Sequence, residues 1–188
     1  VLSVVSKIAQ LQSSRIRVIA GNVMTGDGAR ALIDSGAQTI KVGCKGRFSG
    51  VGVPALSAIM EVSKACSMTS TPVLADGCLF SASDIAKAIA AGADGVILNN
   101  MLAGCDEAPG DIVYEQRNTY KVAHDAKDKE LRRPSYKGRV DKVLEHLMLG
   151  LKQAMVESGS KSIEDLKYGT KFVRQHHISG DDAEGELE

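Results

Sequence analysis

Cys44 and Asp76 are the side chains whose type and position point most directly to chemistry. Cys44 follows a short apolar run, and Arg47 comes three residues later. A thiol beside a cation and a helix start can act as a nucleophile, although a lone cysteine is more often a small buried group. Asp76 closes a second apolar run. Its carboxylate could accept hydrogen bonds from the vicinal hydroxyls of a ribose, or it could cap the turn that follows.

Glycines and amides stand at the ends of four apolar runs, where they could contact a nucleotide. Glycine lets the backbone approach a phosphate closely. A helix that starts after such a position offers free N–H groups and the positive end of its dipole to an anion. The four positions are Gly21-Asn22, Gly43-Cys44, Asp76-Gly77 and Asn99-Asn100.

An internal repeat organises residues 18–98. Similar segments recur with offsets of 55 and 56 residues, 18–22 with 73–77, 31–37 with 87–93 and 40–42 with 96–98. Each copy has the pattern strand, turn, helix, Gly-Ala, strand. The helices start at Thr25 or Asp27 and at Ser81 or Ser83, and they end at Gly36 and Gly92. The pattern predicts strands near 16–21, 39–43, 72–76 and 95–98, and helices near 26–35, 55–67, 82–91 and 139–157.

Repeated strand–helix–strand units imply right-handed crossovers and a parallel sheet. They predict an α/β fold in which this chain supplies about four β/α units, half of a (β/α)8 TIM-type barrel. A doubly wound open sheet is the alternative. The polar stretch 111–138 could form a hairpin or a loop excursion. Residues 175–188 hold five acids and two histidines, so we expect a disordered acidic tail after a barrel portion at 1–174.

The bulk composition narrows the class of partner. Of 188 residues, 44% are hydrophobic, and Lys+Arg and Asp+Glu both number 23. Zero net charge argues against binding to nucleic acid or to an anionic membrane. The four cysteines form no C-x-x-C pair and have no histidine at zinc-ligand spacing, and no signal peptide or long apolar run is present. We therefore expect free thiols, no metal and a cytoplasmic location.

Several strings resemble the catalytic barrel of the IMP dehydrogenase/GMP reductase family, in the family's order and near its spacing. The first are Ile19-Ala-Gly-Asn-Val23, Ile40-Lys-Val-Gly43, Gly50-Val-Gly-Val-Pro54 and Ala75-Asp-Gly77. The others are Asp84 to Asp94, Met101-Leu-Ala-Gly104, Asp106 to Gly110 and Tyr136-Lys-Gly138. The resemblance covers about residues 1–174 and implies the second half of that barrel.

This resemblance implies a nicotinamide-dependent oxidoreductase acting on IMP or GMP, with NAD or NADPH as cofactor. In the dehydrogenase a cysteine attacks C2 of IMP, hydride passes to NAD, and water hydrolyses the thioimidate; in the reductase NADPH drives GMP to IMP with loss of ammonia. Cys44 and Arg47 fall on the cysteine and arginine of the family's cysteine loop. Asp76 falls on the ribose-binding aspartate, Gly77 on the first glycine of the phosphate loop, and Asn22 on an active-site asparagine.

Among the departures from the family's pattern, three concern the cysteine loop and the positions of phosphate-contacting glycines. Gly43 runs directly into Cys44, where the family has Gly-Pro-Gly-Ser ahead of its cysteine. Cys78 stands at the second glycine of Asp-Gly-Gly, and Asn99-Asn100 stands at a Gly-Gly or Gly-Ser. Side chains in place of phosphate-contacting glycines hinder close approach. A non-catalytic family member with a structural, assembly or nucleotide-binding role is therefore the alternative hypothesis.

A half barrel has two open sheet edges. Exposed edges present unpaired backbone groups and favour pairing with another chain. The family is usually tetrameric. We therefore expect a homo-oligomer or a partner that completes the barrel, and we expect this chain to be inactive by itself.

Overall fold

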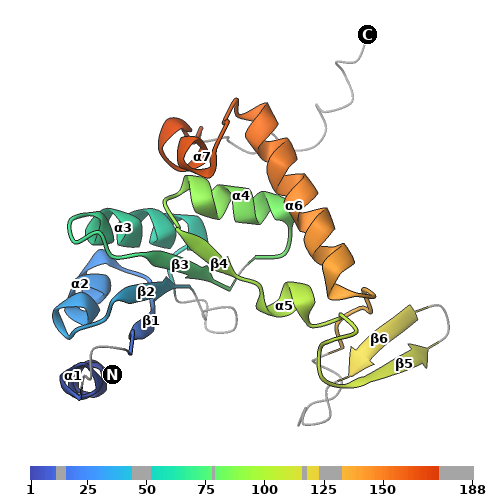
Figure 1. Cartoon of the computed structure of the whole chain (residues 1–188), viewed down its shortest axis with the longest axis horizontal. Coiled ribbons are helices and arrows are strands. Elements are labelled where there is room, and N and C mark those ends of the chain that lie inside the picture. Colours follow the sequence, from blue (N-terminus) through green and yellow to red (C-terminus); the bar gives the residue numbers. More distant parts are fainter. Residues whose placement is uncertain (12–15, 44–51, 78, 116–117, 123–132, 174–188) are drawn as a thin grey trace.

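A sheet of four parallel strands is the centre of the fold (Figure 1). The computed structural model describes residues 1–11, 16–43, 52–77, 79–115, 118–122 and 133–173. The strands lie side by side in chain order as β1 (Ile19–Val23), β2 (Thr39–Val42), β3 (Val73–Asp76) and β4 (Gly95–Ile97). The connecting helices are α2 (Gly26–Asp34), α3 (Ala55–Ser67) and α4 (Ala82–Ala90), and α1 (Leu2–Gln10) precedes β1.

The connecting helices α2, α3 and α4 cover one face of this sheet (Figure 1). Alternate strand residues form the core beneath them, and Ile40, Val42, Val73 and Ala75 are each at most 1% exposed. Strands in chain order with all three crossover helices on one face make a portion of a barrel. The predicted half barrel is confirmed, and the doubly wound alternative is excluded because it needs helices on both faces.

Most predicted elements agree with the structure. The first strand is the exception, because it was expected at 16–21 and runs instead from Ile19 to Val23 through a bulge in its pairing with β2. Two short helices that the repeat does not predict are α5 (Asn99–Leu102) and α7 (Ile163–Gly169). The expected tail at 175–188 lies outside the described residues.

The helix ends follow the predicted capping chemistry. Thr25 begins α2, and its hydroxyl accepts a hydrogen bond from the Gly28 N–H at 3.2 Å. Ser81 begins α4 in a reciprocal capping box with Asp84. Gly36 and Gly92 follow the helices with φ angles of +101° and +110°, a conformation that glycine adopts without steric cost.

Asp84→Asn should lower stability at neutral pH and reduce sensitivity to acid. Burial acts to raise the pKa of the Asp84 carboxyl, but hydrogen bonds from Phe80 and Ser81 outweigh it and leave the pKa lowered. The stabilisation is therefore present above the unfolded pKa, near about 4, and is lost as pH falls through the folded value. Thermal melts should show a loss of roughly 0.5–1 kcal/mol at neutral pH that shrinks below about pH 3. An equal loss of stability at neutral pH and below about pH 3 would contradict the role of the Asp84 carboxylate.

Beyond β4 the chain leaves the sheet and forms a hairpin (Figure 1). Its strands are β5 (Asp111–Glu115) and β6 (Asn118–Val122), which pair antiparallel and confirm a hairpin within 111–138. Lys121 is only 6% exposed, and its Nζ donates to the main-chain oxygen of Asp106 at 3.0 Å. The Tyr136 hydroxyl donates to the Asp106 carboxylate at 2.7 Å. These contacts hold the base of the hairpin against the loop that follows α5.

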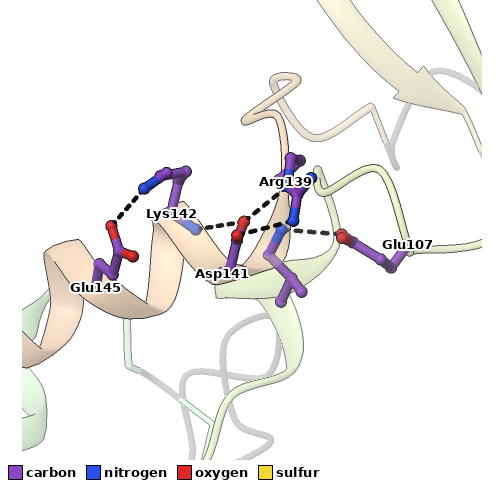
Figure 2. A network of polar contacts seen from close by, with 6 residues as sticks. Glu107, Arg139, Asp141, Lys142 and Glu145 are labelled. Carbon is purple, nitrogen blue, oxygen red and sulfur yellow. Dashed lines mark hydrogen bonds and ion pairs between the residues drawn. The ribbon is translucent and has the colours of Figure 1, made fainter.

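Helix α6 (Val140–Glu157) packs against α4, and its first turn is fixed by a polar network (Figure 2). Glu107 Oε2 accepts a hydrogen bond from the Val140 N–H at 2.9 Å. Arg139 forms two hydrogen bonds with Asp141, at 3.1 and 2.9 Å, which lower the pKa of that carboxyl. Exposed pairs of this kind contribute little free energy. Their effect here is to orient the start of α6 beside the loop after α5.

Candidate functional site

A cluster of polar side chains lies at the C-terminal ends of the parallel strands. Asp76, the last residue of β3 and 9% exposed, is its centre. Asp76 Oδ2 accepts a hydrogen bond from Asn22 Nδ2 at 3.1 Å and lies 2.7 Å from Lys41 Nζ. Asp76 Oδ1 accepts a hydrogen bond from Asn99 Nδ2 at 3.1 Å. We call Asn22, Lys41, Asp76 and Asn99 the Asp76 cluster.

The register of the sheet brings these four residues together. Parallel strands share one C-terminal edge, so residues that are distant in sequence meet there. Lys41 is paired with Gly21 on one side and Leu74 on the other. Asp76 is paired with Ile97 of β4, after which the chain turns into α5 with Asn99 as its first residue.

Gly43 is the point where the end of β2 meets the Asp76 cluster. Gly43 is buried, and its N–H donates to the Val23 carbonyl oxygen at 3.2 Å. A Cβ added at Gly43 would overlap the main-chain oxygen of Asp76 and lie 2.8 Å from Asn22 Nδ2. Glycine is therefore required for β2 and β3 to approach each other at this edge.

The structure brings Asn22, Asp76 and Asn99 into direct contact, as the shared strand edge predicts. Asn22 was expected to open a loop, but it lies inside β1, because pairing with β2 continues to Val23. Gly77 follows Asp76 with φ at +83°, so the chain turns sharply away from the sheet at that residue. Asp76 contacts side chains from β1, β2 and α5.

Three predicted site residues are not placed by these contacts. Cys44 and Arg47 lie outside the described residues. Cys78, which is not a predicted site residue, also lies outside them. Asn100 belongs to α5, but its side chain also lies outside them. The predicted roles of Cys44, Arg47 and Asn100 therefore stay predictions.

Lys41 belongs to the Asp76 cluster, but sequence reasoning did not identify it as a site residue. It lies in β2 between Ile40 and Val42, which are 0% and 1% exposed. A lone cation inside a short buried strand must find an opposite charge or a route to solvent. That pattern was visible in the sequence and could have directed attention to a carboxylate at the same sheet edge.

Two other cysteines are poor candidates for the nucleophile. Cys66 and Cys105 are free and buried. Burial raises the pKa of both thiols, and the negative charges of Asp94 near Cys66 and Glu107 near Cys105 raise it further. Cys66 packs within α3, as expected. Both groups remain protonated near neutral pH, which makes them weak nucleophiles.

A separate hollow of about 490 Å³ lies between α4 and α6, beside α5. No member of the Asp76 cluster lines it, so the polar contacts define a different site. Its lining combines apolar and basic side chains, including Phe80, Met101, Val143, Leu147, Lys137, Lys142 and His146.

Within the described ranges, no group of three or more His, Cys, Asp and Glu side chains is arranged to hold a metal ion. No helix in that part of the chain combines the length and the apolar character needed to cross a membrane.

The fold and the cluster together define a class of protein. Polar side chains at the C-terminal edge of parallel strands, with the helices outside, have the architecture of a (β/α)8-barrel site. This chain supplies four of those strands.

Comparison with known proteins gives the family. A model of the IMP dehydrogenase / GMP reductase domain matches residues 1–126. IMP dehydrogenase from Aquifex aeolicus is 38% identical over 93% of this chain and 42% of its own length, and GMP reductase from Leishmania donovani is 34% identical over 86% and 39%. The crystal structure of a GMP reductase variant from Trypanosoma brucei has a TM-score of 0.82 at 36% identity, covering 93% of this chain and 40% of that one.

The chain therefore belongs to the IMP dehydrogenase/GMP reductase family. It spans about two fifths of the length of these relatives, and it corresponds to a partial barrel.

Proposed function

We propose that this chain binds a purine nucleoside monophosphate, IMP or GMP, at the Asp76 cluster, as part of a nicotinamide-dependent oxidoreductase. One observation carries the proposal. The Asp76 carboxylate is 9% exposed at the C-terminal ends of the strands, which we call the mouth, and side-chain donors orient both of its oxygen atoms. A carboxylate in that setting can accept hydrogen bonds from vicinal ribose hydroxyls. The names of the related enzymes support a purine nucleotide as ligand.

The remaining residues are assigned around that anchor. We place the phosphate near Gly77, Asn99 and Asn100, because the chain turns there at the carboxyl ends of β3 and β4. Gly43 keeps the two strand ends close. Arg47 would supply a positive charge for the phosphate.

Cys44 is the proposed nucleophile of the whole protein. It follows Gly43 in the sequence, and Gly43 packs against Asp76 and Asn22. Its thiolate would add to a purine carbon and form a carbon–sulfur bond, while the electron pair of the C=N bond moves to the ring nitrogen. A seated ribose would fix the distance between sulfur and purine, which is the main requirement for such an addition.

The hydride carrier is proposed on family membership alone, as NAD or NADPH. The described residues do not fit that cofactor by themselves. Within the described ranges, Asp76 is the one carboxylate that the four parallel strands carry at their C-terminal ends. A dinucleotide would add two riboses and a pyrophosphate to be bound beside the substrate. Residues beyond the described part would hold it, and when bound it would supply hydride transfer.

Calorimetric titration tests the nucleotide site directly. The purified chain should bind IMP or GMP roughly 10–100-fold more tightly than the matching 2′,3′-dideoxynucleotide, because the latter cannot donate to Asp76. Purine ring and phosphate are the same in both ligands. Equal affinities would show that the ribose does not reach the carboxylate, and they would remove the basis of the proposal.

The 188-residue chain alone should not turn over IMP or GMP. Turnover needs the sulfur held about 3–3.5 Å from the purine carbon, and loss of positioning can cost several powers of ten in rate. Cys78 and Asn99-Asn100 occupy positions where the resemblance expects glycines that contact phosphate. A nicotinamide absorbance assay checks this. Turnover that Cys44→Ala abolishes would contradict the expectation and strengthen the catalytic assignment.

A non-catalytic, nucleotide-binding family member is the second candidate. Asn99 favours it, because this side chain stands where the resemblance expects glycine, and it hydrogen-bonds Asp76. It therefore contributes to the cluster while occupying space near the phosphate position.

A homo-oligomer or a completing partner is proposed for either function. Ile19 on the edge strand β1 is 55% exposed, and Ile16 just before it is 60% exposed. Apolar side chains beside an open strand edge favour pairing with further strands. A cytoplasmic location is also proposed, from the free thiols of Cys66 and Cys105.

A further inference from the structure

We propose that the hollow between α4 and α6 is a second ligand site, which binds an organic phosphate: a phosphate monoester carried on an apolar body about the size of an aromatic ring system. We call it the α4–α6 hollow. It shares no lining residue with the Asp76 cluster. The inference therefore goes beyond the proposed nucleotide site and does not depend on it.

Three helices and a short connection form the α4–α6 hollow. Helix α6 packs against α4, and α5 lies beside the start of α6 (Figure 1). The side chains that line the hollow come from the start of α4, from α5, from the chain just before α6 and from the first turns of α6. Its volume of about 490 Å³ is within the range of pockets that bind small organic molecules.

The inner surface of the hollow is apolar. Met101 and Leu147 are 4% and 8% exposed, and Val143 packs against the same core. Phe80 borders the hollow and is 57% exposed. An aromatic side chain in that position can stack on the ring of a ligand, and the buried side chains can cover the ligand's apolar surface.

The polar part of the lining is basic. Lys142 and His146 are one turn apart on α6, which places them on the same side of that helix. Lys137 Nζ donates to the main-chain oxygen of Met101 at 2.9 Å, which fixes this ammonium group against α5. An ammonium group has three protons, so further acceptors can bind to it. No carboxylate is among the described residues that line the hollow.

Two neighbouring carboxylates do not remove this positive charge. Glu145 Oε2 accepts a hydrogen bond from Lys142 Nζ at 2.9 Å (Figure 2). Those two side chains are 65% and 68% exposed, so the pair contributes little free energy and Lys142 can exchange it for a ligand. Asp84 Oδ2 accepts hydrogen bonds from the main-chain N–H groups of Phe80 and Ser81, each at 3.0 Å, and so belongs to the cap of α4.

The combination of two lysines and an apolar surface defines the class of ligand. A phosphate monoester carries nearly two negative charges at neutral pH, which two ammonium groups can match, whereas a carboxylate carries one. His146 can add a further N–H donor. Inorganic phosphate alone would leave the apolar surface uncovered, and a neutral ring would leave the lysines without an anion. An organic phosphate satisfies both parts of the lining.

The test uses 1-naphthyl phosphate as the probe and calorimetric titration of the 188-residue chain. Two further ligands separate the parts of the proposal: 1-naphthol has the same ring system without the phosphate, and inorganic phosphate has no apolar body. The wild-type chain should bind 1-naphthyl phosphate at least about 10-fold more tightly than either of them.

Variants on α6 locate the probe. Lys142→Glu should lower the affinity for 1-naphthyl phosphate about 10-fold or more, because it puts a like charge beside the phosphate. Glu145→Gln should raise the affinity by about 2-fold, because it releases Lys142 from its ion pair. Lys152→Glu makes the same change of charge at an exposed position ten residues, about 15 Å, further along α6, and should bind like the wild type.

Lys142 is 68% exposed, so its variants should fold, and circular dichroism melts check this. If Lys142→Glu melts early, Lys142→Gln replaces it and should show a smaller loss in the same direction. Equal losses of affinity in Lys142→Glu and Lys152→Glu would show a general charge effect and overturn the site. Binding no tighter than that of 1-naphthol or of inorganic phosphate would overturn the class of ligand.

Asp76→Asn separates this proposal from the nucleotide site. It should leave the affinity for 1-naphthyl phosphate unchanged, because Asp76 does not line the α4–α6 hollow. A loss in Asp76→Asn without a loss in Lys142→Glu would place the probe at the nucleotide site and overturn the second site. A wild-type chain that shows no preference for ribose over dideoxyribose would overturn the nucleotide site and leave the α4–α6 hollow standing.

Discussion

Gly43→Ala should be the most damaging single-methyl change in the described part of the chain, lowering stability by about 3 kcal/mol or more. The added Cβ would overlap the main-chain oxygen of Asp76 and press on the amide of Asn22. Neither neighbour can move without disturbing the parallel pairing of β2 with β3 or the Asp76 cluster. Chemical denaturation monitored by circular dichroism would measure the loss.

Gly169→Ala is the matched control for that substitution. Gly169 ends α7, and a Cβ added there meets nothing within 4 Å. Alanine should be neutral or should stabilise by up to about 1 kcal/mol, because it restricts the unfolded chain and favours helix. Similar losses in both variants would show that the overlap at Gly43 is relieved at little cost, and that β2 and β3 are not closely packed at this edge.

Asp76→Asn should lower the affinity for IMP or GMP roughly 10–100-fold and remove the preference for ribose over dideoxyribose. The substitution retains the shape of the side chain but replaces one acceptor oxygen with a donor NH₂ group. It also leaves Lys41 without the carboxylate that lies 2.7 Å away. Calorimetric titration with both ligands would measure the two effects together.

Asp34→Asn controls for the loss of one negative charge. Asp34 is exposed at the end of α2, where the chain returns towards the opposite edge of the sheet. The Asp34→Asn chain should bind both the nucleotide and the dideoxynucleotide with the affinity of the wild type. A loss in Asp34→Asn as large as in Asp76→Asn would mean that overall charge, rather than a contact at the mouth, governs binding.

Much of the fold could be predicted because it depends on local patterns. Short apolar runs, polar caps such as Ser81 and glycines such as Gly92 specify where strands and helices begin and end. The repeat then implies parallel pairing. Helix α7 could also have been predicted, since Ser162 and Asp165 form the same kind of capping box as Ser81 and Asp84.

The rest of the site depends on register, which local patterns do not specify. The bulge between Gly21 and Val23 keeps Asn22 inside β1 and places its amide on Asp76. Lys41 reaches Asp76 only because β2 and β3 pair with Lys41 beside Leu74. Sequence reasoning identified Asn22, Asp76 and Asn99 from their places at strand ends. It missed Lys41 because no end-of-strand rule applies to the middle of a strand.

The central claim is that the ribose of a purine nucleotide binds at the Asp76 cluster. The most direct measurement follows the side-chain amide NMR signals of Asn22 and Asn99 while nucleotide is added to the 188-residue chain. Both amides donate to Asp76 and report on any new partner of its carboxylate. IMP or GMP should shift both signals in a saturable way, and the dideoxynucleotide should shift them far less. Signals that stay unchanged, or that respond equally to both ligands, would contradict the account.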